Sequence, residues 1–488
     1  MASSVLDIFR LKRFDQVVLA ALFSLTLAVA LLWGFGDRTL TQVQAFSWEG
    51  QQIGVADQKF QLSFNQALDP AIVTENFTIE PPLAGRWSWV GKTFFYSLDE
   101  RPIYGQDYQF KLAAPTPEAA EKPNIVPFLS RVKSRDRAFA YIGTDGTDRG
   151  RLILYNLTRQ EKSVLTPADL IVLNLDVYPE GDRLLFSAIP RGSAQAEIGD
   201  QQLYTVSTGL NFQGSTDSPP PAGRIQSVLT AKDYRNGAFQ LADNGERIII
   251  QRTNRENPRD RSLWVIEGQA EPRALGIPAD DFLLAPNAEV VAISQQNKLS
   301  LVPLNRNGGA VQAKEEFTKL LAFSPDQTQQ IALQQANGVY SLHRIDAQGE
   351  ATEILRTLTP IIDCRFEPRA AELLYCLKLD RNETSGQVLE EPFLSALNLK
   401  TGEETALLAL PNYRDVGLSI AADGVALLFD QVVTTPPTPT SDLFTSTGLA
   451  VEGGRLWLLA LPELETDTEI QPVPPESLLP GYQPQWIP

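Results

Sequence analysis

A short pattern of apolar and polar positions recurs along the chain. It consists of an apolar strand end, a turn built from Pro, Asp, Asn or Gly, and a second apolar strand. Its clearest copy is the run AFSPD at residues 322–326, followed by the apolar residues 331–333. Turn residues between two short apolar runs predict a β-hairpin, because Pro, Gly, Asn and Asp favour the backbone angles of tight turns. Recurrence of one hairpin predicts an all-β repeat architecture.

Further copies of this hairpin pattern keep the turn and the apolar run behind it. They lie at residues 177–186, 241–250, 284–293, 366–375 and 420–429, and residues 485–488 contain the first half of the pattern before the chain stops. A propeller blade is a four-stranded antiparallel sheet of about 40 to 50 residues. With the copy at 322–333, the pattern therefore predicts seven blades, and six or eight blades remain alternatives because insertions blur the spacing.

The ends of the predicted ring must meet, because an open ring would leave an edge strand exposed. Residues 137–142 and 152–157 have the pattern of later strands in a blade that lacks its innermost strand. The C-terminal residues around Trp486 could supply that strand next to Phe139. We therefore expect a seven-bladed β-propeller over residues 131–488, closed by the C-terminal strand. Third strands of successive blades are expected at residues 203–206, 263–266, 299–302 and 456–459.

The copy at residues 322–333 resembles the repeat of bacterial WD-like propellers, such as the periplasmic propeller of the Tol system. The resemblance implies the architecture. A role as a periplasmic sensor or trafficking factor would follow from the same resemblance, but propellers host unrelated functions on one fold.

An apolar segment precedes the predicted ring. Residues 17–35 carry no charged side chain, and a helix of roughly 20 residues spans a bilayer core of about 30 Å. Arg10, Lys12 and Arg13 precede it, which places the N-terminus in the cytoplasm. The sequence thus predicts a cytoplasmic segment at 1–15 and a transmembrane helix at 16–36. The bulk would lie in the periplasm, the thylakoid lumen or the cell exterior. A cleaved signal peptide is the alternative.

Residues 42–114 are predicted to form a small separate domain. Phe60, Leu62 and Phe64 alternate with polar residues, as do Tyr108 and Phe110, and this period of two is typical of half-buried strands. Aromatic core candidates between these strands are Trp87, Trp89, Phe94 and Tyr96.

The runs at residues 64–70, 76–79 and 105–108 resemble the bacterial Ig-like domain of surface and S-layer-associated proteins. The resemblance implies a β-sandwich that serves as a spacer or an adhesive module. A tyrosine corner could form at Tyr108. Four prolines in residues 115–130 predict a stiff linker into the ring.

The charge balance of the chain limits the classes of molecule that it is expected to bind. The chain has 42 basic and 59 acidic residues, for a net charge of −17. Such a charge argues against nucleic acids and anionic lipid headgroups as main partners, and basic partners or simple solubility fit it better. A local exception is the loop cluster Arg252, Arg255, Arg259 and Arg261. It could bind an acidic partner, or it could simply be solvated loop charge.

The two cysteines, Cys364 and Cys376, fall on the paired strands of one predicted hairpin. This spacing would allow a disulfide in an oxidising compartment. If Phe366 faces Leu373, however, Cys364 faces Tyr375 and Cys376 projects to the other side of the sheet. A bulge of one residue would reverse that conclusion. A disulfide and two buried thiols both remain open.

Catalytic motifs are sparse in the sequence. The single histidine, His343, has no second imidazole to complete a metal site or a His-based relay, and no Gly-x-Ser-x-Gly elbow or phosphate-binding loop occurs. We expect no cofactor. Acidic residues are numerous, so a carboxylate pair for glycoside cleavage stays open. Asp280 and Asp281 could line the ring mouth, but adjacent strand residues point to opposite faces.

Four insertions lengthen connections within the predicted blades, at residues 209–224, 254–262, 380–392 and 434–454. Loops of this kind often form binding surfaces. Leu443, Phe444 and Leu449 are candidate apolar anchors for a partner, although the segment could instead be a disordered loop.

We therefore predict a non-enzymatic, membrane-anchored scaffold or docking protein outside the cytoplasm, which binds proteins through its propeller loops and could join a membrane complex. The alternative from another class is an envelope enzyme that hydrolyses glycans or peptides in the propeller funnel. An enzyme would require carboxylates from different blades to converge within about 5 to 10 Å.

Overall fold

The computed structural model describes residues 13–34, 40–55, 57–114, 125–192, 195–210, 220–305, 310–369, 371–384, 387–410, 416–461 and 473–488. The chain divides into two compact units. Unit 1 comprises Met1–Glu49, Gln58–Glu100 and Asp107–Val132, and unit 2 comprises Gly50–Asp57, Arg101–Gln106 and Lys133–Pro488.

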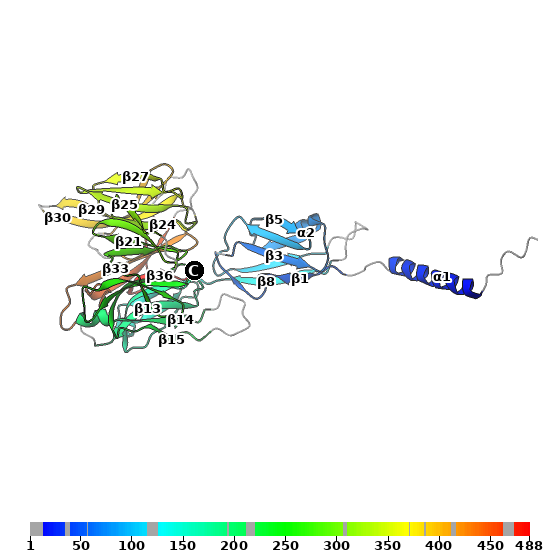
Figure 1. The fold of residues 1–488 in the computed structure, drawn as a ribbon, viewed down its shortest axis with the longest axis horizontal. Coiled ribbons are helices and arrows are strands. Elements are labelled where there is room, and N and C mark those ends of the chain that lie inside the picture. The colour runs from blue at the N-terminus through cyan, green and yellow to red at the C-terminus, as the bar shows by residue number, and fades with distance from the viewer. Residues whose placement is uncertain are drawn as a thin grey trace, which may run out of the picture. The chain divides into compact units, whose positions relative to one another are not determined.

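The first helix, α1, spans Arg13–Gly34 (Figure 1). Its described side chains, at residues 17–30, are all exposed. Within the part of the chain that the structure describes, no helix is long and apolar enough to cross a membrane. The transmembrane helix predicted at 16–36 extends beyond the residues whose side chains are described. Residues 1–12 of the predicted cytoplasmic segment and 115–124 of the predicted linker also lie outside them.

Two four-stranded sheets follow, with the orders β1-β3-β6-β5 and β2-β8-β7-β4. Their strands are β1 (Val43–Phe46), β2 (Gln52–Ile53), β3 (Lys59–Phe64), β4 (Phe77–Glu80), β5 (Gly85–Val90), β6 (Thr93–Leu98), β7 (Asp107–Leu112) and β8 (Phe128–Ser134). Helix α2 (Pro70–Asn76) begins after Asp69, whose carboxylate accepts a hydrogen bond from the Ala71 amide at 3.0 Å. Strand β8 begins within the predicted linker.

The predicted alternation in these sheets is confirmed. Phe60, Leu62 and Phe64 of β3 are buried, as are Tyr108 and Phe110 of β7. The Phe60 ring lies 5.3 Å from that of Phe110, so aromatic side chains of the two sheets share one core.

Seven more four-stranded sheets occupy the described part of unit 2, and we number them as blades 1 to 7. Blade 1 contains β9 (Ala138–Gly143), β10 (Leu152–Asn156), β11 (Glu161–Val164) and β36 (Gly481–Trp486). Blade 2 contains β12 (Leu170–Val177), β13 (Arg183–Pro190), β14 (Gln202–Ser207) and β15 (Ile225–Leu229). Blade 3 contains β16 (Tyr234–Leu241), β17 (Arg247–Asn254), β18 (Arg261–Glu267) and β19 (Arg273–Ala274).

The remaining blades follow in chain order. Blade 4 contains β20 (Asp281–Leu284), β21 (Val290–Gln295), β22 (Lys298–Pro303) and β23 (Gln312–Lys314), and blade 5 contains β24 (Lys319–Phe323), β25 (Gln330–Ala336), β26 (Val339–Ile345) and β27 (Ala351–Thr357). Blade 6 contains β28 (Ile361–Phe366), β29 (Leu373–Thr384), β30 (Gln387–Asn398) and β31 (Glu404–Ala409), and blade 7 contains β32 (Leu418–Ile420), β33 (Ala426–Thr435), β34 (Ala450–Ala460) and β35 (Glu476–Ser477). Short 3₁₀ turns lie at Gly146–Asp148 and Gln195–Asp200.

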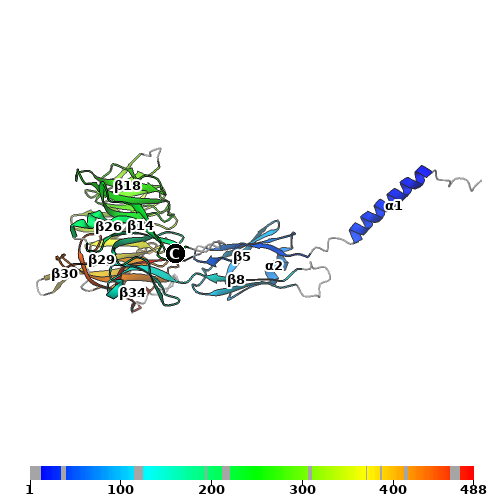
Figure 2. The same ribbon diagram turned by 90° about the horizontal axis from the view of Figure 1, so that it is seen from below.

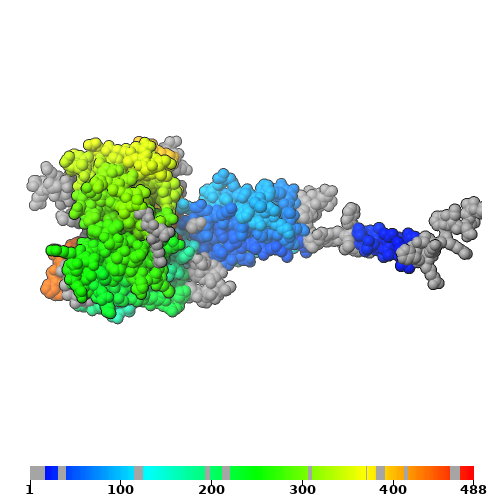
Figure 3. Space-filling model, in the orientation of Figure 1, coloured from blue at the N-terminus to red at the C-terminus, as the bar shows by residue number. Residues whose placement is uncertain are grey.

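Hydrophobic clusters join each blade to the next. Ile249 of blade 3 and Ile293 of blade 4 share one cluster, for example, and a further cluster joins blade 7 to blade 1. The intervening pairs are joined in the same way, so the seven sheets form a closed ring, an arrangement consistent with the blades of a β-propeller. In Figure 2, β18 of blade 3 and β34 of blade 7 lie on opposite sides of unit 2. Blades 3 to 5, green to yellow, form most of the face of unit 2 visible in Figure 3.

The predicted closure by the C-terminal strand is confirmed. Strand β36 pairs antiparallel with β9, and Trp486 lies opposite Phe139. The two rings are 5.8 Å apart, and the Trp486 indole N–H donates to the Ser419 carbonyl of blade 7 at 3.1 Å. The last strand thus completes blade 1 and bonds to blade 7.

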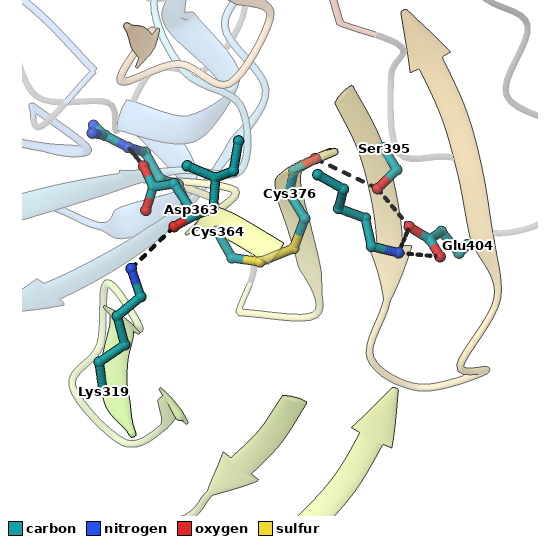
Figure 4. Close-up of a disulfide and its surroundings, with 9 residues drawn as sticks. Lys319, Asp363, Cys364, Cys376, Ser395 and Glu404 are labelled. Atoms are coloured by element: carbon teal, nitrogen blue, oxygen red, sulfur yellow. Dashed lines mark hydrogen bonds and ion pairs between the residues drawn. A yellow bond between two sulfur atoms is a disulfide. The ribbon is translucent and has the colours of Figure 1, made fainter. Parts of the chain in front are cut away.

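The two cysteines are joined by a disulfide, and both are buried (Figure 4). The register that we expected from the sequence is wrong by one residue. The Glu367 amide donates to the Leu373 carbonyl at 2.9 Å, so Glu367 rather than Phe366 stands across from Leu373. Cys364 therefore lies directly opposite Cys376.

Candidate functional site

A cavity of about 690 Å³ lies within unit 2, and we call it the central cavity. Its walls come from the innermost strands of blades 2 to 6, β12, β16, β20, β24 and β28, and from Gln485 of β36. Six charged side chains line it: Asp176, Asp243, Asp281, Lys319, Asp363 and Arg365. Carboxylates from four different blades therefore converge on one space.

Asp176 joins blade 2 to blade 3. Its two carboxylate oxygens accept hydrogen bonds from the amides of Val177 and Leu241, each at 2.9 Å. Burial raises the pKa of Asp176 to about 6, and the nearby carboxylate of Asp243 adds to the rise, while the two amide donors oppose it. Asp176 is therefore mostly ionised at pH 7, and it takes up a proton as the pH falls through about 6.

Asp243 lies in the turn that follows β16. Burial raises the pKa of Asp243, and the Arg365 guanidinium opposes the rise. Within the described residues, neither Asp176 nor Asp243 forms an ion pair, so together they leave negative charge facing the cavity.

The other charges of the central cavity are paired. Lys319 Nζ lies 3.8 Å from a carboxylate oxygen of Asp281 and donates to the Ile362 carbonyl at 3.2 Å, which links blades 4, 5 and 6. The guanidinium of Arg365 lies 3.1 Å from the carboxylate of Asp363. Figure 4 shows Lys319 and Asp363 beside the disulfide. These pairs largely cancel each other's charge.

The cavity chemistry favours a cationic ligand group. Two carboxylates that form no ion pair with a described residue face a space that has the size of an ordinary ligand pocket, and Arg365, which acts on both electrostatically, is itself paired with Asp363. Across the described residues, no group of three or more His, Cys, Asp and Glu side chains could hold a metal ion.

The four arginines singled out in the sequence do not form one exposed patch. Arg252 is buried, and its guanidinium lies 4.6 Å from the ring centre of Tyr234 and 4.9 Å from that of Trp264. Arg255 donates to Asp200 at 2.6 Å, and Arg261 donates to Gln251 at 2.6 Å. Arg259 is exposed. Three of the four guanidinium groups therefore make contacts within the fold, and their role in partner binding stays a prediction.

The candidate apolar anchors lie mainly in the core. Leu443 and Phe444 are buried in the cluster that blades 1 and 2 share, and Leu449 is half-buried. Arg149 of blade 1 pairs with the neighbouring Asp442 at 2.7 Å and holds this segment to the ring. Their role in partner binding is likewise untested. His343 lies on β26, and its ring packs 5.2 Å from that of Phe317.

Sequence reasoning placed Asp281 at the ring mouth but missed Asp176 and Asp363 as lining residues. One available signal was a lone acidic residue inside the apolar run of an inner strand, as in LIVLNLDV of β12 and IIDCRF of β28.

No protein-family model matches the chain, and no curated protein matches it. The structure is similar to solved structures of TolB-like and lactonase-like β-propellers. TolB from Acinetobacter baumannii is 11% identical with a TM-score of 0.38, over 85% of this chain and 83% of that one. A putative 6-phosphogluconolactonase from Bacteroides uniformis is 12% identical with a TM-score of 0.40, over 72% and 99%.

An oligogalacturonate lyase from Vibrio parahaemolyticus is 11% identical with a TM-score of 0.41, over 74% of this chain and 99% of that one. At these TM-scores the similarities support no conclusion about activity.

Proposed function

We propose that this protein is a non-enzymatic docking protein that binds a basic polypeptide segment of a partner in the central cavity. The observation that carries the proposal is the convergence of Asp176 and Asp243, from different blades, on one cavity of about 690 Å³. A lysine or arginine side chain entering there would supply a direct ion-pair partner for these two carboxylates.

Electrostatics favour a cationic partner at longer range as well. The net charge of −17 attracts positively charged chains, and a cavity lined by carboxylates focuses that field. The paired charges of Lys319 and Arg365 would hold the cavity wall in place around the ligand.

A second candidate is a glycan or peptide hydrolase, because the raised pKa of Asp176 beside a second carboxylate suits a general acid. The docking function is favoured, since both oxygens of Asp176 already accept backbone hydrogen bonds. A general acid must reach the leaving group, whereas a fixed carboxylate can still attract a cation. Turnover of aryl glycosides or peptides that Asp176→Asn abolishes would support the hydrolase instead.

The proposed location is outside the cytoplasm, with attachment to a membrane through α1. The exposed, uncharged side chains at residues 17–30 support attachment, and the Cys364–Cys376 disulfide is compatible with an oxidising compartment. The aromatic-cored sheets of unit 1 support an Ig-like spacer. Alkaline carbonate extraction of membranes tests the attachment, and release of the chain into the supernatant would contradict it.

The docking proposal is tested with the full chain in detergent and a fluorescent peptide of alternating Lys and Gly. We expect saturable binding that the double variant Asp176→Asn, Asp243→Asn weakens at least tenfold. The matched control Glu256→Gln, Glu271→Gln changes the net charge equally at exposed sites and should bind as the wild type does. Equal binding by both double variants would overturn the proposal. Asp243→Asn alone, in a turn that tolerates Asn, keeps the test valid if Asp176→Asn impairs folding.

A further inference from the structure

A second cavity, of about 290 Å³, lies where blades 6 and 7 meet the C-terminal strand. We call it the seam cavity. Ile362, Leu377 and Val432 form apolar parts of its wall, and Asp430, Thr445 and Gln483 contribute polar groups. None of its lining residues lines the central cavity.

Gln483 has an unusual backbone. Its φ is +51°, and among the described non-glycine residues with positive φ it alone lies within a strand, while the others lie in turns. The pairing of β36 with β9 shifts register between Tyr482 and Gln485, so Gln483 lies in a β-bulge. A left-handed conformation costs a residue with a Cβ about 1 to 2 kcal/mol. The bulge changes the direction of the Gln483 side chain, and the positive φ of this residue strains the backbone.

Asp430 holds the bulge in place. This residue is only 2% exposed, and its carboxylate accepts hydrogen bonds from the Gln483 amide at 2.5 Å and the Gly417 amide at 2.6 Å. A negative charge is thereby fixed in the wall of the seam cavity by two backbone donors, one in β36 and the other just before β32.

The side-chain amide of Gln483 has an unsatisfied acceptor. Its Oε1 atom is buried and accepts no hydrogen bond from the described residues. A buried acceptor without a donor costs about 1 to 3 kcal/mol. Strain in the backbone and a vacant acceptor in the side chain therefore coincide at one residue of the cavity wall, a combination typical of ligand sites.

We propose that the seam cavity binds a small aliphatic amine. The ammonium group would donate to Gln483 Oε1 near the carboxylate of Asp430, and the alkyl chain would pack against Ile362, Leu377 and Val432. The cavity volume of about 290 Å³ lies at the lower end of the range for ligand pockets and therefore suits a small ligand. This site is independent of the docking function proposed for the central cavity.

The probe is n-butylammonium, and n-butanol and butyrate serve as comparison ligands of similar length. Binding of each is measured by saturation-transfer NMR on the full chain in detergent. We expect saturable binding of the amine and at least fivefold weaker binding of the alcohol and the acid. Gln483→Gly removes the acceptor and suits the positive φ, so it should weaken amine binding at least fivefold while the melting temperature stays equal or rises. Gln483→Asn keeps an amide, tolerates the backbone and should retain part of the binding.

Asp243→Asn distinguishes binding in one cavity from binding in the other. It changes the central cavity alone, so it should leave amine binding unchanged. Equal binding of the three probes, or unchanged amine binding by Gln483→Gly, would overturn the proposal. If Gln483→Gly fails to fold, Thr445→Ala provides the second variant. Removal of its hydroxyl from the cavity wall should weaken amine binding, and unchanged binding would count against the site.

Discussion

The central cavity and the seam cavity are bounded by neighbouring residues of the same strands, but they use charge differently. On β28, Ile362 lines the seam cavity and Asp363 lines the central cavity, at a bulge in the pairing of β28 with β29. In the central cavity, carboxylates lie around a wide space, and two of them form no ion pair with a described residue. In the seam cavity, one buried carboxylate holds backbone amides. The carboxylate charge of the central cavity is available to a ligand, whereas that of the seam cavity mainly stabilises the closed ring.

The largest effect should come from removing the carboxylate of the seam. Asp430→Leu leaves the amides of Gln483 and Gly417 without acceptors, and each unsatisfied buried donor costs about 1 to 3 kcal/mol. We expect a loss of about 3 to 5 kcal/mol in the free energy of unfolding, measured with urea. Asp243→Leu, in the central cavity, should cost less than about 1 kcal/mol. Equal losses would remove the distinction between the two cavities.

The disulfide supplies the next largest effect, because Cys364 lies in the wall of the central cavity. Its two cysteines are 12 residues apart, and a cross-link over a loop of this length stabilises by about 3 kcal/mol. Cys364→Ala, Cys376→Ala should lower the urea midpoint accordingly, and a reductant should do the same to the wild type. A midpoint unchanged in the double variant would show that blade 6 does not depend on the covalent link.

The smallest effect is the pH dependence of the central cavity. The pKa of folded Asp176, about 6, lies above the ordinary value of an unfolded aspartate, so the folded state binds the proton more tightly. The ring should therefore become more stable as pH falls from 7.5 to 5, as far as this group is concerned. Cationic peptide binding should change in the opposite direction and strengthen several-fold from pH 5 to 7.5. Asp176→Asn should flatten that rise, and an unchanged profile would exclude Asp176 as its source.

The ring could be predicted from the sequence because each hairpin pattern lies within one short stretch of the chain. Each hairpin combines turn residues with an apolar run, and the truncated copy near Trp486 pointed to the closing strand. The contacts that shape the cavities are not local. Asp430 and Gln483 lie far apart in the chain and meet only when the ring closes, and Asp176 acquires its second hydrogen bond from the next blade.

The disulfide was one of two alternatives that the sequence left open, and only the expected register was wrong, since a shift of one residue in the turn after Phe366 reverses which side chains face each other. The arginine cluster could not be divided into buried and exposed members from the sequence, because Arg252 meets Tyr234 and Trp264 only in the folded blade.

The most direct test of the docking function is to map where a basic peptide binds. A peptide of alternating Lys and Gly with one benzophenone side chain is cross-linked to the full chain by light, and the attachment sites are found by mass spectrometry. We expect cross-links on the inner strands β12, β16, β20 and β28, and their loss in the Asp176→Asn, Asp243→Asn variant. Cross-links confined to outer strands, or unchanged in that variant, would contradict it.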